Sequence, residues 1–418
     1  MASDAAAAPH IPTMTPPAPT REAALARLAA FAPAMGRAYA ATRNHDRGPE
    51  DRGNVSLLSP HVRHRLVTEA ELVGTALAHH APSACEKFVQ EVVWRSYWKG
   101  WLEQRPSVWA DYRARVAREA EGLATQGGLR RAYEDAVAAR TGIACFDAWA
   151  GELVATGYLH NHARMWFASI WIFTLRLPWT LGADFTYRHF MDGDPASNTL
   201  SWRWVAGLHT RGKHYLARAS NIREYTGGRF DPQGELDERA QPLEEEPPGP
   251  ALPLPKADLP PEGRVALLVT EEDCSAETLP LSRAEVVAAA GLVATAARSP
   301  LPVGAAAARF AEAAVEDGLA RAALRFGVTA DRPPPEALAD WAAASGATTV
   351  VTAYAPVGPV AEALDRLAPA LAARGLRLCR LRRAWDEAIW PHATRGFFQV
   401  RERIPAILRA LGPEIAAP

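Results

Sequence analysis

Residues 192–204 read DGDPASNTLSWRW, a stretch that gathers two carboxylates, an amide and two indoles. Asp192, Asp194 and Asn198 fall within seven residues, and the glycine and proline between them favour a turn. A turn of this kind can direct carboxylates and an amide at one planar, hydrogen-bonding ligand. The pattern is also typical of a calcium-binding loop or of an ordinary capped turn before a helix, and the stretch by itself favours these simpler explanations.

The stretch HNHARM, residues 160–165, lies in a strongly apolar segment with helical spacing. Asn161, Arg164 and Met165 are three and four residues apart and therefore share one helical face. Because burying an unpaired charge is costly, an arginine in such a helix needs an anionic partner, and Asp192 is the natural candidate. A snorkelling arginine at the edge of the helix is the alternative that this stretch leaves open.

The stretch EVVWRSYW, residues 91–98, combines charged and aromatic side chains at helical spacing. Glu91, Trp94, Arg95 and Trp98 share one helical face, and a carboxylate between large aromatic surfaces suits a site that stacks on flat rings and bonds their edges. The alternative is an amphipathic helix on which Glu91 and Arg95 form an exposed pair.

The stretch NVSLLSPHVRHRL, residues 54–66, places two serines before a helix. Ser56, Ser59 and their backbone N–H groups form a common anion-binding arrangement. Simple capping by Ser59, with Pro60 at the first helical position, is the alternative that this stretch favours by itself.

The 418 residues divide into four segments by composition. Residues 1–20 are rich in alanine and proline and are expected to be a disordered tail, whereas residues 21–235 have helical spacing and predict an all-α domain. Residues 236–263, acidic and rich in proline, predict an extended linker, and residues 264–418 predict a parallel α/β domain. The predicted helices span residues 21–42, 84–104, 111–140, 145–157, 160–175, 304–326, 335–345 and 358–374, and the predicted strands span residues 264–271, 347–354 and 375–381.

The total charge conceals an asymmetry between the two halves. Lys and Arg number 46 against 47 Asp and Glu, a net charge of −1 that alone argues against a nucleic-acid partner. Residues 21–235 nevertheless carry 27 basic against 22 acidic side chains, a net charge of +5, with ten of the twelve histidines and ten of the 13 tryptophans. The four cysteines are scattered without metal-ligand spacing, and neither a signal peptide nor a membrane-length apolar run is present, which predicts a cytoplasmic protein without a membrane segment.

In this order and spacing, SLLSP, EVVWRSYW, TGYLHNHARM and DGDPASNTLSWRW resemble the FAD-binding domain of the DNA photolyase/cryptochrome family, from about Tyr39 to Pro232. The resemblance implies an all-helical FAD-binding domain followed by a Rossmann-like parallel α/β domain. The second part is similar to the family's antenna domain, since GATTVVTAYAP (346–356) and WPHATRGFFQVRERIPAIL (390–408) match its late strand and its closing segment. The antenna domain precedes the flavin domain in the family, so the resemblance implies a swapped order here.

The resemblance implies FAD as the cofactor and leaves open an antenna chromophore of unidentified kind. Asp192 would pair with Arg164, Asp194 would bond the ring edge, and Asn198 would face flavin N5, where the family's photolyases keep an asparagine to stabilise the reduced flavin. The residues that match the cofactor site are Tyr39, Ser56, Leu58, Ser59, Arg95, Asn161, Arg164, Asp192, Asp194 and Asn198.

The resemblance further implies a pocket for a flipped-out pyrimidine dimer, in which Trp94 and Trp204 stack on the bases, Glu91 bonds them and Met165 is typical of the cyclobutane class. The candidate catalytic residues are Glu91 and Asn198, together with Trp202 and Trp179, which are implied in photoreduction.

For photoreduction, Trp202 matches the flavin-proximal tryptophan and Trp179 the middle one. The outer position falls near Gln126, so Tyr133, Trp166 or Trp171 would have to provide another route. Thr199, Leu200 and Ser201 also depart from the small glycines that the family usually has before the proximal tryptophan.

The implied function is light-driven repair of damaged DNA, single- or double-stranded, by a monomeric deoxyribodipyrimidine photolyase-like carbon–carbon lyase. Reduced FAD, once photoexcited, would donate the electron that splits cyclobutane pyrimidine dimers. The retained dimer pocket favours repair over the alternative, a cryptochrome-like blue-light photoreceptor without repair activity, which the near-neutral charge and the altered outer tryptophan favour. A flavoprotein without light chemistry is the third hypothesis.

Overall fold

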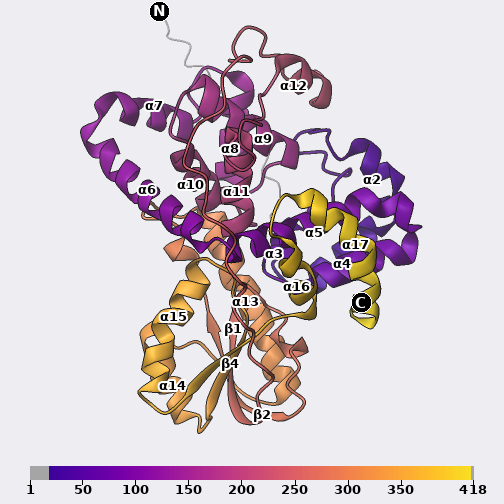
Figure 1. Ribbon diagram of the computed structural model, residues 1–418, viewed down its shortest axis with the longest axis vertical. Helices are drawn as coiled ribbons and strands as arrows, with labels where there is room; N and C mark the ends of the chain where they lie inside the picture. The colour runs from indigo at the N-terminus through magenta and orange to yellow at the C-terminus, as the bar shows by residue number, and fades with distance from the viewer. Residues whose placement is uncertain (1–17, 416–418) are drawn as a thin grey trace, which may run out of the picture.

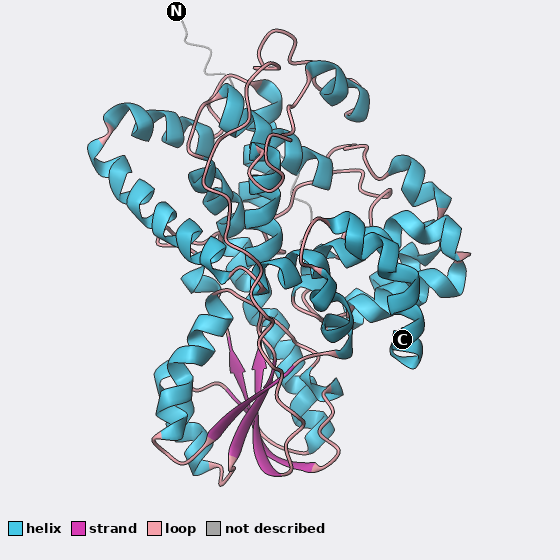
Figure 2. Cartoon of the chain, viewed as in Figure 1, coloured by secondary structure: helices cyan, strands magenta, loops and turns pink. Residues whose placement is uncertain are grey.

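The computed structural model describes residues 18–415, which form a helical half and a half built on a sheet (Figures 1 and 2). This confirms the predicted fold class. Residues 1–17 of the predicted tail lie outside the described residues, and Thr20 already caps the first helix by accepting a hydrogen bond of 3.1 Å from Ala23 N. The helices of the first half are α1 (Arg21–Phe31), α2 (Arg37–Thr42), α3 (Ser59–Arg63), α4 (Glu69–His79), α5 (Pro82–Glu103), α6 (Pro106–Thr125), α7 (Gly127–Val137), α8 (Ala144–Thr156), α9 (Asn161–Ser169), α10 (Trp179–His189), α11 (Pro195–Ala206) and α12 (Ala219–Tyr225).

Two predicted helices are interrupted in the structure. The segment 21–42 is broken between α1 and α2, because a short 3₁₀ turn containing Pro33 and the non-helical Gly36 separate them. The charged segment 111–140 forms α6 and α7, which meet at Gln126. Helix α9 continues into a π-helical turn at Ile170–Thr174, within the predicted range 160–175.

The sheet is parallel throughout, in the order β3-β2-β1-β4-β5. Leu267 of β1 lies between Ala289 of β2 and Val351 of β4. Helix α13 covers one face through Leu319, and α14 and α15 cover the other, so β1 is buried on both faces. The elements of this half are β1 (Gly263–Thr270), β2 (Ala284–Leu292), α13 (Ala305–Phe326), β3 (Ala330–Asp331), α14 (Leu338–Ala344), β4 (Thr349–Ala353), α15 (Pro359–Ala372) and β5 (Arg377–Leu381).

The last two helices, α16 (Ala384–Ile389) and α17 (Phe397–Leu411), pack on α5 of the helical half and not on the sheet (Figure 1). The Trp385 indole donates a hydrogen bond of 2.7 Å to Ser96 Oγ. Trp390 lies so close to Gly100 that a Cβ there would be 2.8 Å from the Trp390 Cα. Although residues 264–418 were expected to form one domain, their last part therefore completes the helical core.

The predicted linker has no helix or strand between residues 236 and 262. It is nevertheless held against the helical half, because Glu245 pairs with Arg203 at 3.1 Å and Leu252 N donates to Gln104 O at 2.8 Å. Among residues 18–415, no helix is long and apolar enough to cross a bilayer.

Candidate functional site

A cavity of about 570 Å³ lies in the helical half, between α2, α5, α9, α11 and the loop before α3. Its size is within the range of small-molecule and cofactor sites. All four motif stretches contribute to its wall, although they come from distant parts of the chain. The predicted site residues that line it are Tyr39, Ser56, Ser59, Glu91, Trp94, Arg95, Asn161, Arg164, Met165, Asp192, Asp194, Asn198, Trp202 and Trp204.

Helix α5 presents Glu91, Trp94, Arg95 and Trp98 to the cavity, as their spacing predicts. Glu91 does not form the surface pair with Arg95 that was the alternative interpretation; its Oε1 accepts a hydrogen bond of 2.6 Å from Arg43 Nη1. Burial raises the pKa of Glu91, and Arg43 opposes this shift. Arg95 instead places positive charge near Asp192 and Asp194, which also line the cavity.

The turn before α11 both caps the helix and faces the cavity. Asp194 is the N-cap, and its Oδ1 accepts a hydrogen bond of 2.8 Å from Ser197 N. Asp192 accepts a hydrogen bond of 3.0 Å from Arg164 Nη2, so the expected ion pair is present and Arg164 does not snorkel to solvent. The Arg164 guanidinium also lies 3.8 Å from the centre of the Phe190 ring. This pair ties α9 to the start of α11.

A buried cluster of two cations and two carboxylates lies behind Asp194. Asp194 Oδ2 is 3.5 Å from Lys99 Nζ and 3.8 Å from Arg63 Nε. Both cations also contact Glu272, which follows β1. Lys99 Nζ is 3.7 Å from Glu272 Oε2, and Arg63 Nη2 is 2.7 Å from Glu272 Oε1. Burial alone would raise the pKa of Asp194, but Lys99 and Arg63 outweigh it and hold the pKa far below its usual value. The cluster therefore joins the cavity to the sheet half.

Several buried polar atoms of the cavity wall have no hydrogen-bond partner among the described residues. Buried polar groups are normally paired, so such atoms indicate a polar ligand. Ser59 does not cap α3, which begins at Ser59 itself, and its hydroxyl is one of these atoms. The atoms without a partner are Ser59 Oγ, Arg95 Nη1, Asp192 Oδ1 and Ser197 Oγ. Asp194 Oδ2 also lacks a hydrogen bond, but it is paired in charge with Lys99 and Arg63.

Two predicted site residues do not line the cavity. Leu58 is 1% exposed and lies in the core, because Leu57 has a φ of 56° and lines the cavity in its place. Trp179 lies in the core, where its ring stacks on Tyr112 at 6.0 Å and its indole N–H donates to Glu245 at 2.9 Å.

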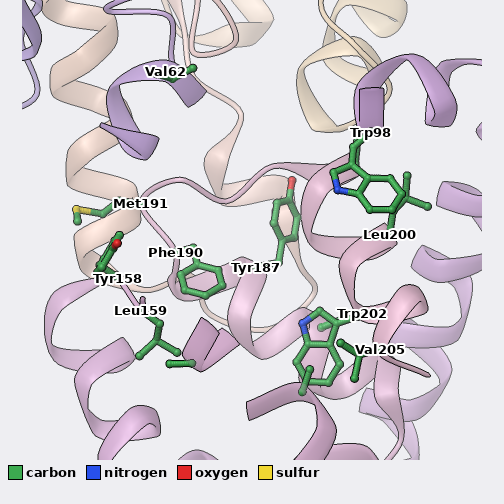
Figure 3. Packing of buried hydrophobic residues seen from close by; sticks show 14 of the residues in the cluster. Val62, Trp98, Tyr158, Leu159, Tyr187, Phe190, Met191, Leu200, Trp202 and Val205 are labelled. Atoms are coloured by element: carbon green, nitrogen blue, oxygen red, sulfur yellow. The ribbon is translucent and has the colours of Figure 1, made fainter. Parts of the chain in front are cut away.

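Trp202, which was predicted to be the flavin-proximal tryptophan, contacts Trp171 and not the predicted middle tryptophan, Trp179. Trp202 lines the cavity and packs edge-on against Trp171, with 6.2 Å between ring centroids, and Trp171 packs edge-on against Tyr133 at 6.0 Å. Gly182 permits this arrangement, because a Cβ there would lie 2.4 Å from Trp202 and 2.7 Å from Trp171. Figure 3 shows part of the buried hydrophobic cluster, in which Trp202 and Phe190 also line the cavity.

The cavity-wall residues that were not found from the sequence include Arg43, Tyr158, Thr186 and Phe190. Arg43 and Thr186 have no motif around them, and their roles depend on contacts across the fold. Tyr158 and Phe190 flank the two motif stretches in the chain, so proximity to HNHARM and DGDPASN was the available signal.

Residues 88–244 match the family model described as the FAD-binding domain of DNA photolyase. The chain is similar to a deoxyribodipyrimidine photo-lyase of Streptomyces griseus, 35% identical over 189 residues, which are 40% of this chain and 38% of the relative. It is also similar to a deoxyribodipyrimidine photo-lyase of Thermus thermophilus, 33% identical over 230 residues, 53% of this chain and 50% of the relative. The chain thus spans half or less of the length of these curated relatives.

Cryptochrome-1 of Arabidopsis thaliana is 34% identical over 100 residues, which are 24% of this chain and 14% of the relative. Among solved structures, a bacterial class III photolyase from Agrobacterium tumefaciens has a TM-score of 0.40 at 24% identity, with 50% of this chain and 43% of that chain covered.

Proposed function

We propose that this chain, whose helical half contains an FAD-binding domain of the DNA photolyase/cryptochrome family, is a light-driven DNA repair enzyme that splits cyclobutane pyrimidine dimers. One observation carries the proposal: the cavity has a buried polar floor and an accessible aromatic mouth. The floor holds the unpartnered polar atoms, whereas Trp94 and Trp204 are only partly buried and the Glu91 side chain is 38% exposed. A cofactor and an external flat substrate would thus meet in one cavity.

The polar floor fits FAD. Ser59 Oγ and Arg95 Nη1 are donors suited to a diphosphate, and Asp192 Oδ1 is an acceptor for cofactor N–H or hydroxyl groups. When bound in its reduced form, FAD supplies an electron donor that visible light can excite. We assign its binding to Tyr39, Ser56, Ser59, Arg95, Asn161, Arg164, Asp192, Asp194 and Asn198, and Leu58 is left out because it lies in the core.

The mouth suits an extruded pair of pyrimidines. Trp94 and Trp204 offer faces on which bases stack, and Met165 adds apolar surface beside them. Glu91 would hydrogen-bond the dimer from its place beside Arg43, whose Nη1 lies 2.6 Å from its Oε1. Extrusion from the helix is cheap for a lesion, because a damaged base stacks and pairs poorly.

The sheet half has a supporting role in this proposal. Ligands of open parallel sheets bind outside the carboxyl ends of the strands. At the end of β1 this place is filled by the helical half, since His64 Nδ1 donates to Glu271 O at 2.7 Å, and Ser275 Oγ donates to Arg65 O at 2.7 Å. An antenna chromophore stays a prediction, and it would have to bind elsewhere. We expect a monomer that acts in the cytoplasm.

The experiment that tests the function measures repair directly. Reduced, FAD-loaded protein is illuminated with a thymine-dimer oligonucleotide, single-stranded and double-stranded, and restored thymines are quantified by chromatography. The expected result is light-dependent restoration, with none in the dark. Bound FAD without restoration of thymines contradicts repair and favours the blue-light receptor, which would then show a light-dependent change in the protein without substrate turnover.

A further inference from the structure

Two exposed basic segments meet beside the mouth of the cavity. The Tyr97 hydroxyl donates to Arg395 O at 2.8 Å and lies 3.1 Å from His209 Nε2. Tyr97 therefore joins the tip of α17, residues 394–401, to the turn 208–213. We call these two segments the basic rim.

The basic rim adjoins both indoles of the mouth. At the tip of α17, Phe397 packs on Trp94 with 3.7 Å between ring centroids. The turn follows α11 directly, only four residues after Trp204, and His209 packs on Trp98 at 4.6 Å. The rim therefore contacts Trp94 and Trp98, two residues that line the cavity.

The rim carries four exposed cations, and Glu402, directly after its last residue, is the nearest acid in the sequence. Arg211, Lys213, Arg395 and Arg401 are exposed, and neither segment contains Asp or Glu. Such a cluster matches the spaced phosphates of a nucleic-acid backbone better than it matches an acidic or neutral small molecule.

The basic rim also contains an exposed aromatic side chain, Phe398. Phe398 is 65% exposed, and the Arg401 guanidinium lies 4.9 Å from its ring centre. Phe397, Val400 and Ile404 form the buried stripe of α17, so Phe398 projects from the neighbouring flank. Exposing a phenyl group of this size to water gains nothing for the stability of α17.

We propose that Phe398 is a wedge that enters the base stack of duplex DNA where the lesion has been extruded, while the four rim cations bind the flanking phosphates. This inference rests on the proposed function, because it needs a base-flipped substrate. Apolar side chains fill such gaps in proteins that unstack DNA. Phe398 therefore sets the preference for double-stranded over single-stranded substrate, in which no gap forms.

The experiment measures binding in the dark, apart from repair. Two probes are used. One is a thymine-dimer duplex with 2-aminopurine opposite the lesion, and the fluorescence of 2-aminopurine reports unstacking. The other is the same dimer strand alone. For Phe398→Ala we expect about tenfold weaker duplex binding and a smaller fluorescence rise, with unchanged single-strand binding and FAD content. Leu324→Ala, which removes another exposed side chain on α13 in the sheet half, is the matched control. It should change neither the duplex affinity nor the fluorescence rise.

The outcomes separate the two proposals. Equal duplex binding by Phe398→Ala and wild type, or an equal loss on both substrates, overturns the wedge. Dark binding that depends on Phe398 without any repair in light supports the wedge and contradicts the repair proposal. Wild-type protein that binds the lesion duplex no better than undamaged duplex overturns both. For the cations, Arg401→Gln should lower the slope of log affinity against log salt by about one.

Discussion

The Trp202 indole N–H donates a hydrogen bond of 3.0 Å to the hydroxyl of Thr186. The same hydroxyl is 3.0 Å from Asn198 Oδ1, and the Asn198 amide donates to Ala183 O at 2.8 Å. Thr186 thus fixes both an indole and an amide of the cavity wall, and it determines which way the Asn198 amide is turned.

Replacing Thr186 should show this dual role. Thr186→Val keeps the shape but leaves the Trp202 N–H and Asn198 Oδ1 unpaired, so we expect a loss of about 1–3 kcal/mol in unfolding free energy. We also expect a shifted absorption spectrum of bound FAD. Thr186→Ser retains the hydroxyl and should restore both. Identical urea curves and spectra for the two variants would show that the hydroxyl positions nothing.

Removing Glu91 should separate cofactor binding from repair. Glu91 lies at the mouth and bonds Arg43, and its carboxyl oxygens are not among the unpartnered atoms of the floor. Glu91→Ala should lower the repair yield about ten- to hundredfold, the value of a hydrogen bond to a charged group, while FAD content stays unchanged. Glu121→Ala, an exposed carboxylate on α6, is the control. Loss of FAD in Glu91→Ala would place this carboxylate in the cofactor site.

The parts of the site that could be predicted from the sequence were those decided by helical spacing or by the cost of burying an unpaired charge. A buried arginine needs a carboxylate, and this requirement led from Arg164 to Asp192 across 28 residues of chain. Helical spacing likewise placed Glu91 on the cavity face. It could not supply the partner of Glu91, because Arg43 comes from α2 and only the packing of α2 on α5 brings the two together.

Prediction of the fold also failed where the sequence pattern of a segment does not determine its contacts. Strand β2 was missed, since AEVVAAAGL is rich in alanine and lacks the β-branched run that marks β1. Residues 384–411 follow the last strand in the chain and were grouped with it, but their apolar stripe is buried against α5. Sequence order identifies an amphipathic helix and does not identify the surface that it covers.

The order of aromatic contacts predicts the path of photoreduction. Trp202→Phe should abolish photoreduction of bound FAD, because Trp202 is the tryptophan of this path that lines the cavity. Trp171→Phe should slow it more than Trp179→Phe, since Trp171 is the ring in contact with Trp202. Trp149→Phe, in the buried core, is the control. The rates are followed by flavin absorbance under blue light with an external reductant.

A stronger effect of Trp179→Phe would instead favour a route through Tyr112, on which Trp179 stacks. Unchanged photoreduction in Trp202→Phe would show that Trp202 is not the proximal donor.

The C-terminal helices should be needed for the stability of the helical half. Trp390 is fully buried, and its carbonyl accepts a hydrogen bond of 3.0 Å from the Gln104 side chain. Trp390→Ala should cost about 3–5 kcal/mol in unfolding free energy measured with urea. Trp341→Ala, a half-buried tryptophan of α14 in the sheet half, should cost less. Equal costs would mean that α16 and α17 contribute little to the helical core.

The Asp192–Arg164 pair makes a prediction about acid stability. Burial alone would raise the pKa of Asp192, but Arg164 and Arg95 outweigh it and hold the pKa below its ordinary value of about 4. The unfolded chain therefore takes up this proton at a higher pH than the folded protein. The stabilisation is complete above the ordinary pKa and is lost as the pH falls through the lowered one.

Asp192→Asn should thus have two effects on the urea unfolding free energy. At pH 7 it should fall by about 3 kcal/mol, because Arg164 loses its partner in a largely buried site. Between about pH 5 and pH 2 it should fall less steeply than in wild type, because the amide does not titrate. Asp135→Asn breaks an exposed pair with Arg140 at 3.0 Å and should change neither value by more than about 1 kcal/mol. An acid limb as steep as that of wild type in Asp192→Asn would mean that other carboxylates, Asp194 first among them, account for the acid sensitivity of the cavity floor.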